Sequence, residues 1–341
     1  MKQSNLSRLL QSRLFTTMVR ISPWRVAFVS LWLVTLLYFL THRETRVTIR
    51  RNIQDVFARL HDKGAVDAIF RSALKGISYH YMEKLYVAYS RDQQWKDYCL
   101  ERVRVRGRRT VDRYLRRNRG VILVTAHFGA VELLPGLLTL LGYRVAIIAR
   151  FKTPRLKSKS QERAESVGAA IIDANEPSSF FLALSALRQG RILITQCDEV
   201  ECWRTDPKRA IEILGSLFQF DRTPTILQRR SKCPVVFGYV RREGKGHYTA
   251  EIEDVCGPDG DHQEGIGVAI LKKLEKLVYT HPDQWYIWKN FQRMKTTPVG
   301  DIAVEDQKRH HIPVTPPTVP TLQPPRIITE LHGQYCPQAS V

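Results

Sequence analysis

Short apolar runs alternate with helical stretches through the middle of the chain, and this alternation limits the possible fold more than any other feature. The apolar runs fall at residues 121–125, 145–149, 169–172, 192–195, 235–239 and 248–255. The helical stretches fall at residues 131–141, 156–167, 178–188, 223–230 and 265–281. Nearly continuous apolar runs are typical of strands that are buried on both faces of a parallel sheet. The pattern therefore predicts an α/β fold, with a mostly parallel central sheet flanked by helices.

The region before this alternation is predicted to be mainly helical. Apolar residues recur at every third or fourth position across residues 44–95, which is typical of amphipathic helices. A short strand is predicted at 103–105 and a basic helix at 110–118. The 341 residues include 43% hydrophobic and 25% charged residues, which is close to the average of globular proteins. The composition therefore excludes a wholly disordered chain and a multi-pass membrane protein.

An apolar run near the N-terminus extends from Val26 to Leu40 and is interrupted only by Ser30 and Thr35. It is shorter than the roughly 20 apolar residues that span a bilayer, although its flanks could extend it. Arginines lie on both sides, so the charges give no orientation. Three interpretations remain: a membrane anchor that spans the bilayer or lies in its interface, a cleaved signal peptide, and a buried core helix. We favour the anchoring helix because no small-residue cleavage site follows the run.

These patterns divide the chain into four parts. Residues 1–22 form a basic N-terminal segment, residues 23–42 the membrane-anchor helix, and residues 43–295 the main domain. Residues 296–341 contain eight of the 17 prolines of the chain. Because proline is excluded from helix interiors and central strands, we predict that this last part is a disordered or extended tail.

The six cysteines are scattered along the chain and form no Cys-x-x-Cys pair. Disulfide frameworks are typical of short secreted chains, so reduced thiols are expected here. Cys197 and Cys202 lack a second Cys/His pair at a spacing that binds zinc. We therefore predict no metal site.

The chain carries 53 Lys and Arg against 33 Asp and Glu, a formal net charge of +20. This excess favours an anionic partner, which could be nucleic acid, an anionic membrane surface, or an acidic carrier or substrate. Aromatic residues do not interleave with the basic stretches as they do in a base-stacking surface. No helix-turn-helix or zinc-finger pattern is present either. We therefore predict an anionic membrane surface, and no nucleic acid, as a partner.

The strongest chemical motif is His127 followed by Glu132, directly after the apolar run at 121–125. Ligands of open α/β sheets bind at the carboxyl ends of the strands, which is where this histidine is expected. Glu132 would hold one imidazole nitrogen, and the other nitrogen would take a proton from a substrate hydroxyl. Without a Gly-x-Ser-x-Gly motif, the base would act on the acceptor directly. The alternative is a structural histidine that caps a helix, with Glu132 in solvent.

Several motifs in order along the chain resemble those of the lipid A late acyltransferases (lauroyl/myristoyl type), a branch of the lysophospholipid acyltransferase superfamily. The resemblance runs from about Arg43 to Lys295. It rests on His127-Phe128-Gly129 with Glu132, on Ile148-Ala149-Arg150, on Arg163 before Gly168, on the strand-end Asp198, on Gly215, on Arg229-Arg230, and on Gln284, Trp285, Trp288 and Arg293. Together these ordered motifs are more specific than the His-x4-Glu motif alone.

The resemblance implies an acyltransferase whose catalytic domain spans residues 43–295. It would move a fatty acyl group from a thioester, on acyl carrier protein or coenzyme A, to a hydroxyl of a membrane lipid, a lipid A precursor. His127 would be the catalytic base and Glu132 its partner. Substrate binding would fall to Arg150, Arg163 and Asp198, and no cofactor is implied. The resemblance also implies a bacterial inner-membrane protein whose catalytic domain faces the cytoplasm.

The sequence leaves the acceptor open. Ala130-Val131 stands where the family often has Asn-Trp, and Gln196-Cys197-Asp198 keeps only the second acid of the family's Asp-x-Asp. These changes affect substrate contacts more than the base. The acceptor could therefore be a lysophospholipid or another membrane lipid. A basic lipid-binding or nucleic-acid-binding protein without catalytic activity is the alternative from a different class.

Overall fold

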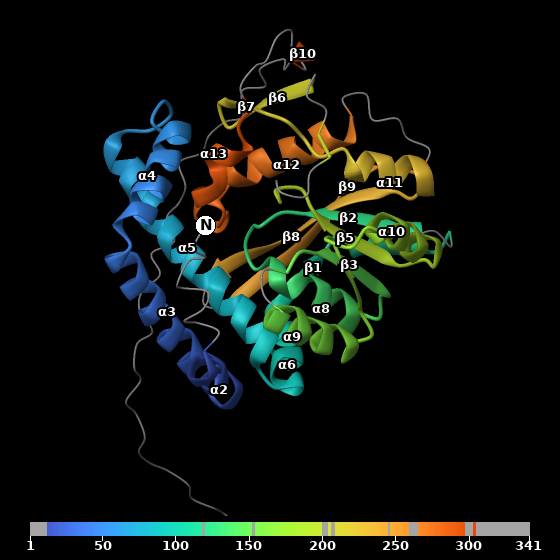
Figure 1. Cartoon of the computed structure of the whole chain (residues 1–341), viewed down its shortest axis with the longest axis horizontal. Helices are drawn as coiled ribbons and strands as arrows, with labels where there is room; N and C mark the ends of the chain where they lie inside the picture. The colour runs from blue at the N-terminus through green and yellow to red at the C-terminus, as the bar shows by residue number, and fades with distance from the viewer. Residues whose placement is uncertain are drawn as a thin grey trace, which may run out of the picture.

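The computed structural model describes residues 12–117, 120–151, 154–199, 204–205, 209–244, 246–258, 265–296 and 303–304, and Figure 1 shows its architecture. A central sheet lies between two groups of helices, and four N-terminal helices cover one end of it. The predicted α/β class is confirmed.

The central sheet has seven strands within the described residues, in the order β1-β9-β8-β2-β5-β3-β4. Their bounds are Val103–Arg106 (β1), Val121–Thr125 (β2), Val145–Ala149 (β3), Ala170–Asp173 (β4), Ile192–Gln196 (β5), Val235–Gly244 (β8) and His247–Cys256 (β9). Only β8 and β9 pair antiparallel, and all other neighbours are parallel. All five residues of β2 are buried, as expected for a strand with helices on both faces. The prediction of a mostly parallel sheet is confirmed.

Helices cover both faces of the sheet. One group contains α6 (Asp92–Arg102), α8 (Leu134–Leu140) and α9 (Pro154–Glu165), and the other contains α10 (Ser179–Arg188), α11 (Thr223–Ser231) and α12 (Ile266–Thr280). Helix α7 (Arg108–Leu115) packs beside β9. After α12 the chain continues through η3 (Pro282–Gln284), η4 (Trp288–Asn290) and α13 (Phe291–Met294).

The predicted helix at 131–141 is divided into two parts. A 3₁₀ turn, η1 (Val131–Leu133), precedes α8, and Pro135 lies in the first turn of α8. Proline fits the start of a helix because its missing N–H has no helical partner there. The division matters because Glu132 lies in η1 rather than on a continuous helix.

Four helices form the N-terminal region: α2 (Arg13–Ile21), α3 (Trp24–Thr41), α4 (Arg43–Phe57) and α5 (Lys63–Tyr89). Among the described residues, α3 is the single helix that is long and apolar enough to cross a membrane, with a mean hydropathy of 1.6. It runs alongside α5 (Figure 1), against which it packs. Residues such as Phe28 and Leu31 are buried, whereas Val29 and Leu37 on the outer face are more than half exposed. The helix therefore presents an apolar face to the surroundings.

A second, small sheet joins β6 (Arg209–Ile213), β7 (Ser216–Phe218) and β10 (Ala303–Val304). The sequence did not predict it. Leu214 and Gly215 both have positive φ, 52° and 67°, as the tightest hairpin turns require. Ala303 and Val304 belong to the predicted tail and pair with β6. The tail beyond Val304 lies outside the described residues.

Candidate active site

His127 and Asp198 are brought together by two neighbouring parallel strands. His127 follows β2 and Asp198 follows β5, and Thr125 is paired with Gln196 in register. The backbone N–H of Cys197 donates to the carbonyl of Thr125 at 2.8 Å. Because the two strands are parallel, the residues that follow them emerge at the same carboxyl edge of the sheet, where ligands of such folds bind.

The carboxylate of Asp198 holds both the backbone and the ring of His127. Its Oδ1 lies 2.8 Å from His127 Nδ1, and the backbone N–H of His127 donates to Oδ1 at 3.1 Å and to Oδ2 at 2.9 Å. The indole Nε1–H of Trp285 also donates to Oδ2 at 3.0 Å. A carboxylate only accepts, so Nδ1 carries the proton and Nε2 of the neutral ring is the proton acceptor. Asp198 was predicted to bind substrate; its side chain is completely buried and contacts His127.

The other ring nitrogen of His127 faces a second acid. Glu199 Oε2 lies 3.4 Å from His127 Nε2, and a quarter of the Glu199 side chain is exposed. Burial alone would lower the pKa of His127, but the carboxylates of Asp198 and Glu199 favour the imidazolium and raise that pKa above its usual value. His127 is therefore a stronger base than a free imidazole.

Glu132 was predicted to contact the imidazole of His127. In the structure, Asp198 makes this contact instead. Glu132 Oε1 lies 3.1 Å from Lys84 Nζ and 3.8 Å from His80 Nε2, both on α5. Because the chain after His127 forms a turn and then η1, the Glu132 side chain faces α5. The negative charge of Glu132 raises the pKa of Lys84, which remains an ammonium ion.

The rings of His80 and Tyr286 connect Glu132 and Lys84 to His127. His80 stacks on Tyr286 with ring centres 3.3 Å apart, and Tyr286 meets the His127 ring edge-on at 4.9 Å. Burial and the nearby Lys84 hold the pKa of His80 well below its usual value, so His80 is neutral. The site thus has one histidine suited to take a proton and another that serves as a packing surface.

The turn after His127 is braced by Arg242 and Gln284. Arg242 donates two hydrogen bonds of 2.7 Å to the buried carboxylate of Glu83 and one of 2.7 Å to the carbonyl of Gly129. The N–H of Gly129 donates to the backbone carbonyl of Gln284 at 2.8 Å. A bidentate guanidinium–carboxylate pair fixes direction as well as charge. The turn that carries His127 is therefore tied to α5, β8 and η3.

We expect Gly129→Ala to reduce both stability and activity. Gly129 has a φ of +59°, and an added Cβ would lie 1.8 Å from the carbonyl oxygen of Val240. The left-handed conformation alone costs an alanine about 1–2 kcal/mol, and the overlap requires β8 to move as well. Gly142→Ala is the matched control, because its φ is +88° but no atom lies within 4 Å of its added Cβ. Equal melting temperatures for the two variants would contradict the close packing at Gly129.

The two arginines that were predicted to bind substrate lie in different surroundings. Arg150 directly follows β3 and is exposed at the carboxyl edge of the sheet, two strands from β2. Arg163, on α9, binds the carboxylate of Asp92 and the carbonyl of Ser90. It also lies 5.2 Å from the Trp95 ring centre. Arg163 is therefore held by α6 and the end of α5.

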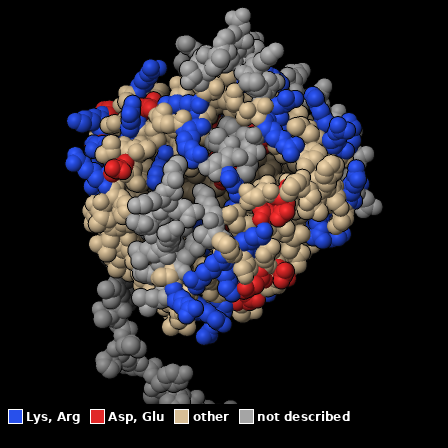
Figure 2. Space-filling view, in the orientation of Figure 1, with Lys and Arg blue, Asp and Glu red and all other residues tan. Residues whose placement is uncertain are grey.

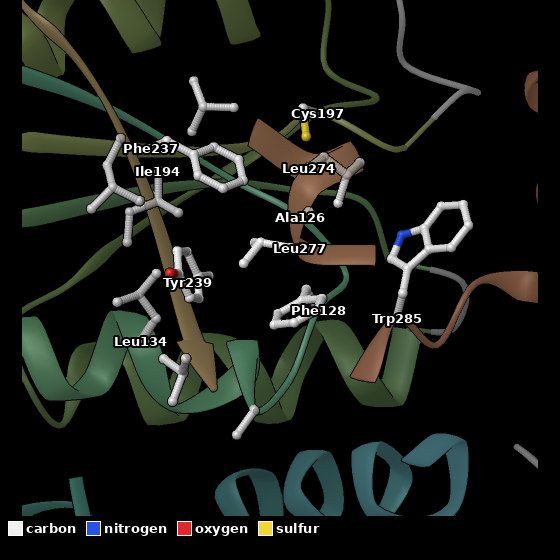
Figure 3. Close-up of a cluster of buried hydrophobic side chains, with 14 of the residues drawn as sticks. Ala126, Phe128, Leu134, Ile194, Cys197, Phe237, Tyr239, Leu274, Leu277 and Trp285 are labelled. Atoms are coloured by element: carbon white, nitrogen blue, oxygen red, sulfur yellow. The ribbon is translucent and has the colours of Figure 1, made fainter. Parts of the chain in front are cut away.

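Trp285 and its neighbours lie on the core side of the site. Figure 3 shows Ala126 and Phe128, which flank His127 in sequence, within the buried cluster and Trp285 at its margin. Trp285 is fully buried, and Phe128 forms a backbone bridge with it. Sequence reasoning did not identify Lys84, Glu199, Tyr286 or Arg242. Of these, only Glu199 had a signal that could have been used, since it directly follows Asp198.

The fold and the site define an α/β protein with a carboxylate-oriented histidine at the carboxyl edge of its sheet. The sequence profile of the family described as bacterial lipid A biosynthesis acyltransferase matches residues 14–295, more than four fifths of the chain. The chain therefore belongs to this acyltransferase family and is an acyltransferase. The match begins upstream of Arg43 and so also includes α3. No curated protein matches the chain.

Proposed function

We propose that the protein is a membrane-anchored O-acyltransferase that moves a fatty acyl group from a thioester to a hydroxyl of a lipid A precursor. The donor would be acyl carrier protein or acyl-coenzyme A. The observation that carries this proposal is the 2.8 Å contact that fixes His127 Nδ1 on Asp198 and leaves Nε2 as the proton acceptor. A lysophospholipid or another membrane lipid is the alternative acceptor.

In the proposed reaction, His127 Nε2 takes the proton of the acceptor hydroxyl while the hydroxyl oxygen attacks the thioester carbonyl carbon. The tetrahedral intermediate then collapses and the carbon–sulfur bond breaks. The thiol leaves with the proton that His127 returns, so the base is regenerated. Asp198 holds the correct tautomer and stabilises the imidazolium between the two proton transfers. Each turnover forms one ester and releases one thiol.

We assign Glu132 and Lys84 to electrostatic support of this reaction. Lys84 is held by Glu132 at 3.1 Å, and its positive charge acts on both His127 and Glu199. An ammonium ion at this position would stabilise negative charge on the attacked carbonyl or on an anionic substrate. Arg150, at the same edge of the sheet, would face the anionic head group, because a guanidinium matches phosphate oxygens well. These roles keep Glu132 in the catalytic machinery without contact to His127 Nδ1.

We propose that α3 attaches the catalytic domain to the cytoplasmic face of the inner membrane by lying in the interface. Its outer face is apolar, while its inner face packs on α5. Helix α5 carries Lys63, Asp67 and Arg71, and such charges are costly within the hydrocarbon region. A helix packed along α5 therefore fits the interface better than the membrane interior.

Transfer should increase as the pH rises through the pKa of His127, because only the neutral imidazole accepts a proton. Glu199→Gln removes a negative charge 3.4 Å from Nε2, so the raised pKa should fall and the acidic limb of kcat/KM should move to lower pH. Glu176→Gln, on a surface loop, is the control and should leave the limb in place. An acidic limb that Glu199→Gln leaves unchanged would contradict this role of Glu199.

The proposed function is tested with the purified full-length chain in detergent. Acyl carrier protein or coenzyme A, each charged with a fatty acyl group, is supplied with either a lipid A precursor or a lysophospholipid. Mass spectrometry should show one added acyl group on the lipid A precursor. Acylation of the lysophospholipid alone would favour the alternative acceptor. No acylation with any donor and acceptor, while the protein is folded, would reject the proposal.

A further inference from the structure

A basic cavity of about 610 Å³ lies away from His127, between α2, the C-terminal end of α5 and α9. Six cationic side chains line it: Arg13, Arg20, Arg91, Arg155, Lys159 and Arg163. Figure 2 shows Lys and Arg side chains gathered on the surface where α2, α6 and α9 meet in Figure 1. The cavity begins near Ala88, eight residues beyond His80 on α5, which corresponds to about 12 Å of helix. It is therefore separate from the transfer site.

The acids of the cavity do not balance its cations. Asp92 binds Arg163, and Glu162 binds Lys159; these are its two lining acids. Within the described part of the chain, Arg13, Arg20 and Arg91 form no ion pair with an acidic side chain. Six cations converge from three segments although like charges repel one another. Such an arrangement is suited to an anionic ligand.

Buried polar atoms without partners point to the same ligand. Tyr89 is 8% exposed and lines the cavity, yet its hydroxyl has no hydrogen-bond partner among the described residues. The Nε of Arg163 is likewise buried without a partner in this part of the structure. Arg155 and Lys159 line the same cavity as Tyr89. Unpaired buried donors are rare in native proteins and call for an explanation.

The position of the cavity identifies the source of the anion. Thr16, Thr17, Arg13 and Arg20 lie on one face of α2, and α2 ends three residues before α3 begins. Basic residues that flank an apolar membrane helix lie at the depth of the lipid head groups. We propose that this cavity binds the head-group phosphate of an anionic glycerophospholipid of the bilayer, at a site separate from the acceptor. The arginines and the Tyr89 hydroxyl would donate to the phosphate oxygens. The inference rests on the proposed membrane contact of α3.

The test measures binding of a soluble lipid rather than acyl transfer. Short-chain phosphatidylglycerol, below its micelle concentration, is titrated into the full-length chain in non-ionic detergent. We expect saturable binding that Tyr89→Phe weakens several-fold, since this change removes the unpaired hydroxyl and no charge. The variant with Arg13, Arg20 and Arg155 all changed to glutamine should bind at least about tenfold more weakly.

A matched control removes three charges elsewhere. Arg144, Arg188 and Arg230 lie at or near the amino ends of β3, β5 and β8, away from the cavity. Changing all three to glutamine should therefore leave lipid binding unchanged. Equal weakening by both triple variants would show that only overall charge matters, and would overturn the proposal. Displacement of the lipid by coenzyme A or by acyl carrier protein at equal concentration would assign the cavity to the donor, and would overturn it too. Because transfer is not measured, either failure leaves the proposed reaction untouched.

Discussion

Replacing His127 by alanine is expected to lower kcat/KM for acyl transfer by about 10²–10⁴-fold, the contribution usual for a positioned general base. The fold should persist, because β2 and the buried neighbours Ala126 and Phe128 keep their packing. Initial rates of ester formation, measured with the purified variant, provide the test.

His247→Ala is the control for this loss, since His247 is an exposed histidine at the start of β9. It should retain the full rate. Normal transfer by the His127→Ala variant would remove the base from the mechanism, whatever the behaviour of the control.

Asp198→Asn should produce the second large effect, again about 10²–10⁴-fold in kcat, because an amide can present the wrong group to Nδ1 and no longer stabilises the imidazolium. The carboxylate is replaced by a group of the same size, so packing is retained. One of the three N–H donors that now meet Asp198 would face an NH₂ group, at a cost of about 1–3 kcal/mol in stability. Single-turnover rates separate the chemical loss from the lower melting temperature.

A pH profile distinguishes orientation of His127 from simple structural support. Without the negative charge of Asp198 the pKa of His127 should fall, so the remaining activity should extend to lower pH than in the unchanged protein. Asp254→Asn, which changes a carboxylate that accepts from Tyr114 on another part of the sheet, should not move the profile. A normal rate for Asp198→Asn together with a large loss for Glu132→Gln would return the orienting role to Glu132.

The sequence was sufficient for features that depend on local pattern. The nearly continuous apolar run at 121–125 and the long amphipathic stretch at 265–281 predicted β2 and α12 because burial imposes their periods directly. The position of His127 at the end of a strand followed from the same pattern. The hairpin of β6 and β7 was missed, since charged residues such as Arg209 and Glu212 interrupt its apolar pattern.

The partner of His127 could not be obtained in this way. Its identity depends on β5 being the neighbour of β2, although their aligned starts, Val121 and Ile192, are 71 positions apart in the sequence. Spacing alone favoured Glu132, but the turn at Gly129 and the 3₁₀ geometry of η1 direct that side chain toward α5. Lys84 and Tyr286 reach the site from distant parts of the sequence, so no local pattern indicates them.

Helix α5 has a consequence for how the protein can be handled. One side of it contacts Phe28 of α3, which lies against Tyr79 and Tyr86. Another side carries Glu83, which accepts from Arg242 beside the turn that follows His127. Helix α3 and the site around His127 are therefore connected through α5. Deleting the N-terminal helices to obtain a soluble enzyme would uncover this aromatic cluster and loosen the support of His127. A detergent or nanodisc that covers α3 is the better route to an active preparation.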